Sequence, residues 1–114
     1  MTDSREVVLS LVDALNNEDF KTARSFVDDK MTFVGVLGSR DGANAYFKDM
    51  ELMKLKYDLK KVFVEGDEVC LIYNLKMSGV NVMCCGLYHV RDGKVLSLKV
   101  IFDPRPVIES SGKK

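Results

Sequence analysis

The sequence predicts a single α+β domain in which three N-terminal helices pack on a curved antiparallel sheet. In the first half of the chain, apolar residues recur every three or four positions, as on one side of a helix. The second half alternates with a period of two between turn signals, as strands do. A chain of 114 residues has room for one domain, which we assign to residues 1–109, with a disordered polar tail over residues 110–114.

Three helices and one strand are expected before the turn signals begin. A first helix is predicted over residues 6–16, and a second, shorter helix begins at Phe20. A run of β-branched and aromatic residues over 31–36 predicts a strand. The apolar spacing over residues 43–53 predicts the third helix.

Four long antiparallel strands are expected over residues 57–102. Turn signals around Gly66, around Gly79 and at Asp92-Gly93 separate them, and the last of these is typical of a tight hairpin. Pro104 then ends the last strand, because proline cannot donate to a strand ladder.

Centring each hairpin on its turn assigns alternate side chains to the two faces of the sheet. The face that we expect the helices to cover collects Tyr57, Leu59, Phe63, Cys70, Ile72, Asn74, Met83, Cys85, Leu87, His89, Leu96, Leu98, Val100 and Phe102. The opposite face is also apolar, with Leu71, Tyr73, Leu75 and Tyr88 in its middle strands. Because an exposed apolar patch of that size marks an interface, we expect a homodimer through this second face of the sheet.

Charge and composition limit the classes of partner and cofactor that we expect for this protein. Lys and Arg number 17, as do Asp and Glu, so neither nucleic acid nor an anionic membrane is an expected partner. The charged start at residues 2–6 fits neither a signal peptide nor a membrane span, which predicts a cytoplasmic protein. The odd set of Cys70, Cys84 and Cys85 predicts reduced thiols. With His89 as the only histidine and no cofactor motif, we expect neither a metal nor a cofactor.

Several short segments carry a resemblance to a known superfamily. They lie at helix exits, strand starts and the last hairpin, over residues 15–20, 27–33, 38–42, 91–95 and 102–104. In order and spacing they resemble the cone-shaped, cystatin-like roll of the SnoaL-like, ketosteroid-isomerase-like superfamily, also called nuclear transport factor 2-like. The resemblance covers nearly the whole chain and implies an apolar pocket between helices and sheet. Because the superfamily hosts several enzyme classes and plain binding modules, it selects no activity.

The catalytic groups of that superfamily's known branches are absent from the matching positions. The tyrosine and base positions of the ketosteroid isomerase branch fall at Leu11 and Val34. Its second acidic donor falls near Cys85 or Gly86. The expected inner face also lacks the Asp-Arg-Asp set of the epoxide-hydrolase-like branch, and the chain lacks the paired histidines of the dehydratase branch.

We therefore expect a small-molecule binding domain with an apolar pocket for a small apolar or aromatic ligand. The expected lining is Leu11, Leu15, Val34, Met50, Tyr57, Asn74, Cys85, Leu98 and Phe102. The alternative is a cofactor-free isomerase or lyase of the polyketide-cyclase kind, with Asp103 or His89 as the base. A dimeric protein-interaction module is a second alternative, so the sequence leaves open whether the protein is an enzyme.

Overall fold

The computed structural model describes residues 3–77 and 79–112, which form six strands and four helices. The helices are α1 (Ser4–Asn16), α2 (Phe20–Ser25), α3 (Ala43–Met53) and α4 (Arg105–Gly112). The strands are β1 (Val27–Gly35), β2 (Gly38–Asp41), β3 (Tyr57–Glu65), β4 (Glu68–Met77), β5 (Val80–Arg91) and β6 (Lys94–Phe102). Among the described helices, none has the length and apolar character needed to cross a membrane.

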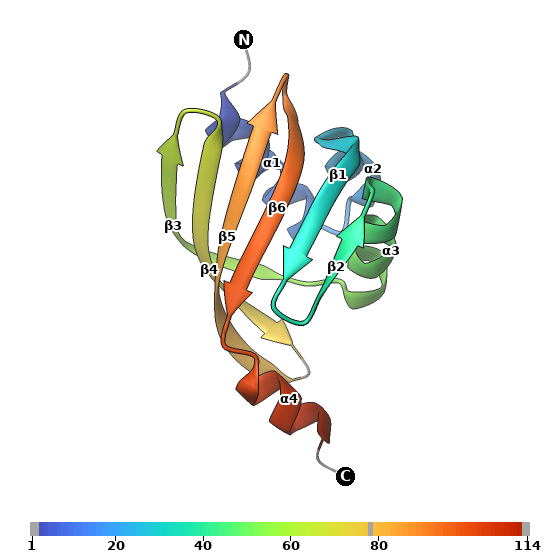
Figure 1. Cartoon of the computed structure of the whole chain (residues 1–114), viewed down its shortest axis with the longest axis vertical. Coiled ribbons are helices and arrows are strands. Elements are labelled where there is room, and N and C mark those ends of the chain that lie inside the picture. The colour runs from blue at the N-terminus through green and yellow to red at the C-terminus, as the bar shows by residue number, and fades with distance from the viewer. Residues whose placement is uncertain (1–2, 78, 113–114) are drawn as a thin grey trace.

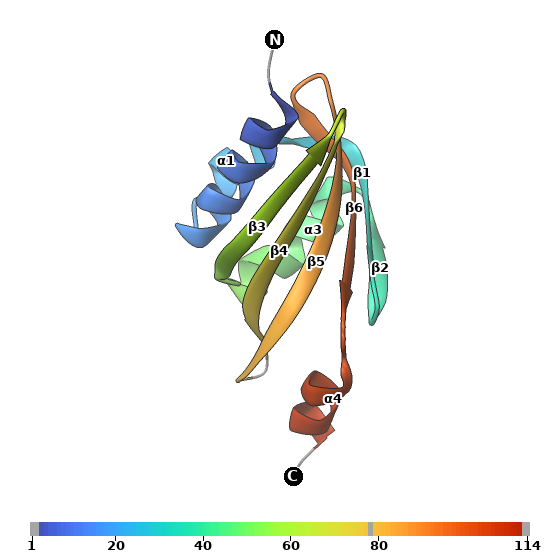
Figure 2. The same ribbon diagram turned by 90° about the vertical axis from the view of Figure 1, so that its left-hand side faces the viewer.

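All six strands belong to one sheet in the order β2-β1-β6-β5-β4-β3. The β1–β6 pair is parallel and the other neighbours are antiparallel. The sheet curves, and α1, α2 and α3 lie together on one of its faces (Figure 1, Figure 2). The predicted α+β fold, with three N-terminal helices packed on a curved sheet, is confirmed.

Local signals set the ends of several elements. Asp3 caps α1 by accepting the Arg5 N–H at 3.0 Å. Gly42 precedes α3 with a φ of 91°, a conformation that favours glycine. The last hairpin turns at Asp92 and Gly93 with φ values of 53° and 76°, as the sequence predicted for a tight two-residue turn.

Two elements were not predicted. Strand β2 pairs with β1, but all four of its residues are exposed, so no apolar alternation marks it in the sequence. Helix α4 starts directly after Pro104 and holds Pro106 in its first turn, where the N–H groups need no helical acceptor. It includes residues 110–112 of the expected tail, whereas residues 113–114 lie outside the described part of the chain.

The assignment of side chains to the two faces was wrong in the middle of the sheet. Leu71, Tyr73, Leu75 and Tyr88 were expected on the open face but are buried beneath the helices. We call the opposite side the outer face, which carries Phe63, Cys70, Ile72, Asn74, Met83, Cys85, Leu87, His89 and Ile101. The registers also place Lys61, Glu68 and Lys99 on the outer face. Because the middle of this face is nevertheless mostly apolar, alternation alone does not say which face the helices cover.

Two register shifts explain why Tyr57, Leu98, Val100 and Phe102, which were predicted on the same face as Cys70 and Cys85, do lie beneath the helices. In β6 an extra residue, Leu96, is left unpaired, so that Tyr88 pairs with Leu98 and both face the helices. In β3 a second shift lies between Leu59 and Lys61. A β-bulge moves every following side chain to the other face relative to a regular hairpin, and counting from the turn does not detect it.

Candidate functional site: an aromatic cavity between α3 and the sheet

A cavity of about 180 Å³ lies between α3 and the helix-covered face of the sheet. Its walls are Phe33, Tyr46, Tyr57, Tyr73 and Phe102, the side chains of Leu37, Met50, Met53, Leu55, Leu75, Leu98 and Val100, and the backbone of Gly35 and Gly38. None of these residues carries a charge. Within the described residues, no group of three or more His, Cys, Asp or Glu side chains is placed to hold a metal ion.

Aromatic rings in close contact form much of the wall. The ring centroids of Tyr57 and Tyr73 are 5.0 Å apart, and those of Phe33 and Tyr46 are 5.5 Å apart. These separations are in the range at which aromatic pairs stabilise each other. The Tyr57 hydroxyl also donates to Met50 Sδ at 3.9 Å, and it interacts with the Tyr46 hydroxyl. These contacts therefore place the hydroxyls of Tyr46 and Tyr57 next to each other.

The tyrosine hydroxyls remain neutral. Burial raises the pKa of Tyr57 to about 12, and it raises the pKa values of Tyr46 and Tyr73 further above the ordinary phenol range. A neutral phenol donates one hydrogen bond and accepts others. The cavity thus combines apolar walls with a few uncharged hydrogen-bonding groups.

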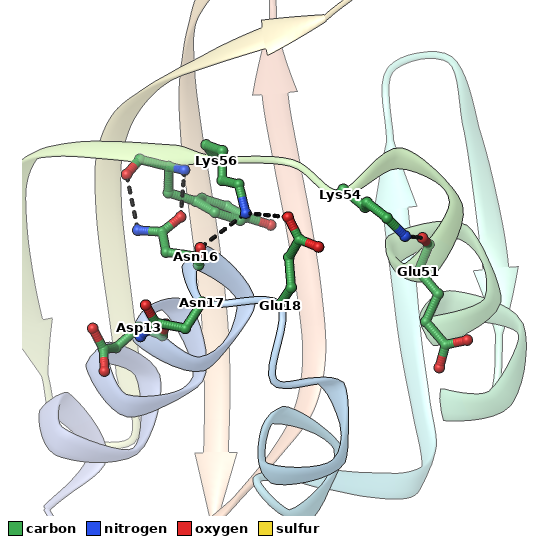
Figure 3. A network of polar contacts seen from close by, with 8 residues as sticks. Asp13, Asn16, Asn17, Glu18, Glu51, Lys54 and Lys56 are labelled. Atoms are coloured by element: carbon green, nitrogen blue, oxygen red, sulfur yellow. Dashed lines mark hydrogen bonds and ion pairs between the residues drawn. The ribbon is translucent and has the colours of Figure 1, made fainter.

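The end of α1 fixes the position of Tyr57. The Asn16 side chain accepts the Tyr57 N–H at 2.6 Å and donates to the Tyr57 carbonyl at 3.1 Å. Two dashed lines at the Asn16 side chain mark these bonds in Figure 3. Asn16 thus pairs with both backbone groups of Tyr57 as a neighbouring strand would. Because buried backbone groups need partners, this contact anchors the first residue of β3 against the helix.

A lysine bridge reinforces the same junction. Lys56 Nζ donates to the Asn16 carbonyl at 2.9 Å and to Glu18 Oε2 at 2.8 Å (Figure 3). The hydrogen bond and the positive charge of Lys56 lower the pKa of Glu18. The end of α1, the start of α2 and the start of β3 are therefore held together beside the cavity.

Four of the nine residues predicted for the pocket line the cavity, namely Met50, Tyr57, Leu98 and Phe102. Leu11 and Leu15 instead lie in the core between α1 and the sheet, with 1% and 2% of their surface exposed. Val34 is 47% exposed, and its neighbour Phe33 lines the cavity instead, because adjacent strand residues point to opposite faces.

The other predicted site residues lie away from the cavity. Asn74, Cys85 and His89 are on the outer face, because the helices cover the opposite side of β4 and β5. Asp103 follows β6 and is exposed, and it accepts a hydrogen bond from Arg105 Nη2 at 2.6 Å. That hydrogen bond lowers the pKa of Asp103 to about 2. Neither predicted base lines the cavity.

Tyr73 is a cavity residue that the sequence analysis placed on the wrong face. The available signal was Gly86, a glycine inside a long apolar strand, where it often marks the close approach of another group. A Cβ atom at Gly86 would lie 3.1 Å from the Tyr73 hydroxyl and 3.2 Å from the Tyr88 ring. Gly86 therefore provides the space that Tyr73 needs beneath the helices.

Comparisons with known proteins agree with this architecture. An NTF2-like protein of unknown function from Cytophaga hutchinsonii is 44% identical, with 95% of this chain and 96% of that chain covered and a TM-score of 0.91. An LEH-like epoxide hydrolase from M. tuberculosis is 21% identical, with 94% and 87% covered and a TM-score of 0.77. A proposed SnoaL-like polyketide cyclase from Jannaschia sp. CCS1 is 19% identical, with 97% and 93% covered and a TM-score of 0.81. The last two comparisons show the shared fold alone.

The family itself is shown by sequence. No curated protein matches the chain. The family model of the SnoaL-like domain matches residues 8–98, which run from within α1 to within β6 and include all of α2, α3 and β1 to β5. The predicted resemblance is confirmed, and the chain belongs to the family of SnoaL-like domains.

Proposed function

We propose that this protein binds a small, neutral aromatic compound in the cavity between α3 and the sheet. The observation that carries the proposal is the lining, which combines apolar side chains with three uncharged tyrosines and includes no charged residue. Mostly apolar walls with a few placed polar groups are typical of small-molecule sites.

The size of the cavity limits the ligand. Its volume is about 180 Å³, and an engineered apolar cavity of about 150 Å³ is sufficient for benzene. A single aromatic ring with one small substituent therefore fits within it.

The polar groups select the substituent. Tyr46 and Tyr57 line the cavity and their hydroxyls are neutral, so a carbonyl or hydroxyl oxygen on a ligand that reaches either hydroxyl finds a hydrogen-bond partner. A carboxylate would be buried without a positive partner, which costs several kcal/mol. An aryl ketone or a phenol thus matches the site better than an aromatic acid.

The residues around the cavity support a ligand-binding function better than an enzyme that transfers a proton. An isomerase or lyase needs a base within hydrogen-bond reach of its substrate. Asp103 is paired with Arg105 beyond the end of β6, and His89 lies on the outer face. The neutral tyrosines can polarise a ligand oxygen, but their raised pKa values keep them protonated, so that no phenolate is present to accept a proton.

Calorimetric titration with three matched compounds tests the proposal. Acetophenone carries a ring and an acceptor, ethylbenzene lacks the acceptor, and benzoate replaces it with a charge. We expect acetophenone to bind with a Kd of about 0.1–1 mM, as is usual for so small a ligand. Ethylbenzene should bind several-fold more weakly, and benzoate should not bind measurably.

Protein variants complete the test. Tyr57→Phe should weaken acetophenone binding and leave ethylbenzene binding unchanged, because only the hydroxyl is lost. Asp103→Asn and His89→Ala serve as controls and should bind acetophenone as the wild-type protein does. Tight benzoate binding, or loss of acetophenone binding in either control, would contradict binding in a neutral cavity. Either result would instead favour an isomerase or lyase that uses Asp103 or His89.

We also propose that the outer face is the interface of a homodimer. Phe63, Met83 and Ile101 on this face are 54%, 67% and 66% exposed, which is unusual for large apolar side chains that share one surface. A second copy would cover the same patch on both chains at once. The formal net charge of +0 means that two copies do not repel each other as a whole.

A further inference from the structure

The outer face holds a pair of thiols. Cys70 on β4 and Cys85 on β5 place their Sγ atoms 3.2 Å apart. In the ladder Cys70 pairs with Leu87 and Cys85 pairs with Ile72, so the two cysteines are diagonal neighbours on adjacent strands. Both are free thiols and both are partly exposed. This pair lies on the side of the sheet opposite the cavity and takes no part in the ligand binding proposed there.

The separation of the sulfurs is close to what a covalent bond needs. The sulfurs of a disulfide are about 2 Å apart, so the two Sγ atoms need to approach by only about 1 Å. The strands that carry them are already paired over their whole length, from Glu68 with His89 to Met77 with Val80. Closure therefore keeps the strand register, but it requires rotation of both side chains and a small local adjustment of the strands, because diagonal neighbours lie near the upper limit of the Cα separation that a disulfide spans.

We propose that Cys70 and Cys85 form a dithiol site that small disulfides oxidise to a cross-strand disulfide. The thiolate of one cysteine attacks a sulfur of the small disulfide, forming a mixed disulfide and releasing one small thiol. The thiolate of the other cysteine then attacks the protein sulfur of this mixed disulfide and releases the second small thiol. The two protons of the cysteine thiols pass to the released thiols, so the protein loses two electrons and the small disulfide gains them.

The third cysteine provides a matched internal control. Cys84 is adjacent to Cys85 in the chain but points beneath the helices and is only 1% exposed. Its thiol donates to the Val82 carbonyl, at 3.8 Å from Sγ. A mixed disulfide at Cys84 has no room to form in the folded protein, so the reaction belongs to the outer pair alone.

The surroundings predict a slow reaction. Burial raises the pKa of the Cys70 thiol to about 11, and the neighbouring Cys85 thiol adds to this rise. Because the thiolate is the reacting form, the first attack is slow at neutral pH, and we expect oxidation over minutes to hours. The second attack is fast by comparison, because the other thiol is already in place.

Oxidised glutathione in excess over the folded protein tests the proposal, with intact-mass measurement, peptide mapping and non-reducing electrophoresis as readouts. The wild-type protein and Cys84→Ser should each lose the mass of two hydrogen atoms, remain a single chain and yield a peptide in which Cys70 is linked to Cys85. Cys70→Ser and Cys85→Ser should instead stop at a glutathione adduct. Circular dichroism of each variant shows that it is folded.

The same measurements are repeated on the Ile101→Lys variant. If two copies of the wild-type protein associate through the outer face, this substitution separates them and leaves the two thiols accessible to glutathione. Closure of the Cys70–Cys85 bond in either background supports the dithiol site. A glutathione adduct that persists in the wild-type protein, a disulfide between two chains, or unreacted thiols in both backgrounds would overturn it.

Discussion

The tyrosines of this chain share one environment, since all four are packed in or beside the space between helices and sheet. Tyr46, Tyr73 and Tyr88 are almost fully buried, and Tyr57 is partly buried in the cavity wall. Burial raises the pKa of each hydroxyl, to about 12 for Tyr57 and further for the others. Ionisation of any of them therefore opposes folding.

This environment predicts loss of stability in alkali. In the unfolded chain tyrosine ionises near pH 10, while the folded chain keeps its phenolic protons up to a pH of about 12 or more. Between these values the native state binds more protons, so the free energy of unfolding falls as pH rises. Each tyrosine contributes a fall of about 1.4 kcal/mol per pH unit in this window.

Tyrosinate absorbance and far-ultraviolet circular dichroism, recorded together during an alkaline titration, measure this effect. We expect the two signals to change at the same pH, because the chain has no exposed tyrosine to ionise first. Tyrosinate that forms near pH 10 while the circular dichroism stays native would show that the hydroxyls are solvated.

At single positions, the sequence revealed the residue types of the site better than their placement. Met50, Tyr57, Leu98 and Phe102 were correctly predicted in the cavity wall. Asn74 and Cys85 were misplaced because β4 and β5 are apolar on both faces, so that period-two alternation has no polar side to mark solvent. Which face is buried depends on where the helices pack, and in the middle strands Gly86 is the residue that carries a signal of it.

Among the elements, the junction of α1 with β3 carries a further prediction. Asn16 makes both hydrogen bonds to the Tyr57 backbone, so Asn16→Ala leaves that N–H and carbonyl without partners. We expect a loss of about 1–3 kcal/mol in the free energy of unfolding, measured by urea denaturation. Acetophenone binding should weaken as well, because Tyr57 loses its anchor.

Asn17 is the matched control for this change. Its side chain donates only to the Asp13 carbonyl within the same helix and is exposed. Asn17→Ala should therefore change the free energy of unfolding by less than about 0.5 kcal/mol, as surface substitutions usually do. Equal losses for the two variants would mean that the contact with Tyr57 does not stabilise the junction.

Elements with a strong periodic signal were predicted, and elements without one were not. The helices α1 and α3 follow their apolar spacing, and the Asp92-Gly93 hairpin follows its turn residues. Strand β2 is polar and exposed throughout, so only its pairing with β1 defines it. The bulge at Leu96 depends on how β5 and β6 pair, which a count along one strand does not reveal.

For the whole molecule, the exposed outer face predicts a dimer in solution at micromolar concentration. Ile101→Lys puts a charge on that face and should yield a monomer by sedimentation equilibrium, because an unpaired charge is costly to bury. Leu52 on α3 is even more exposed, at 76%, but lies on the helical side. Leu52→Lys should therefore remain dimeric, and a wild-type monomer would refute the interface.

The central claim is that the cavity between α3 and the sheet takes up a neutral aromatic ligand, and methionine methyl NMR tests it most directly. Met50 and Met53 line the cavity, whereas Met83 lies 67% exposed on the outer face and serves as an internal reference. Addition of acetophenone to protein labelled at the methionine methyl groups should shift the Met50 and Met53 signals and leave Met83 in place. Unchanged signals for Met50 and Met53, or a shift at Met83 alone, would contradict the claim.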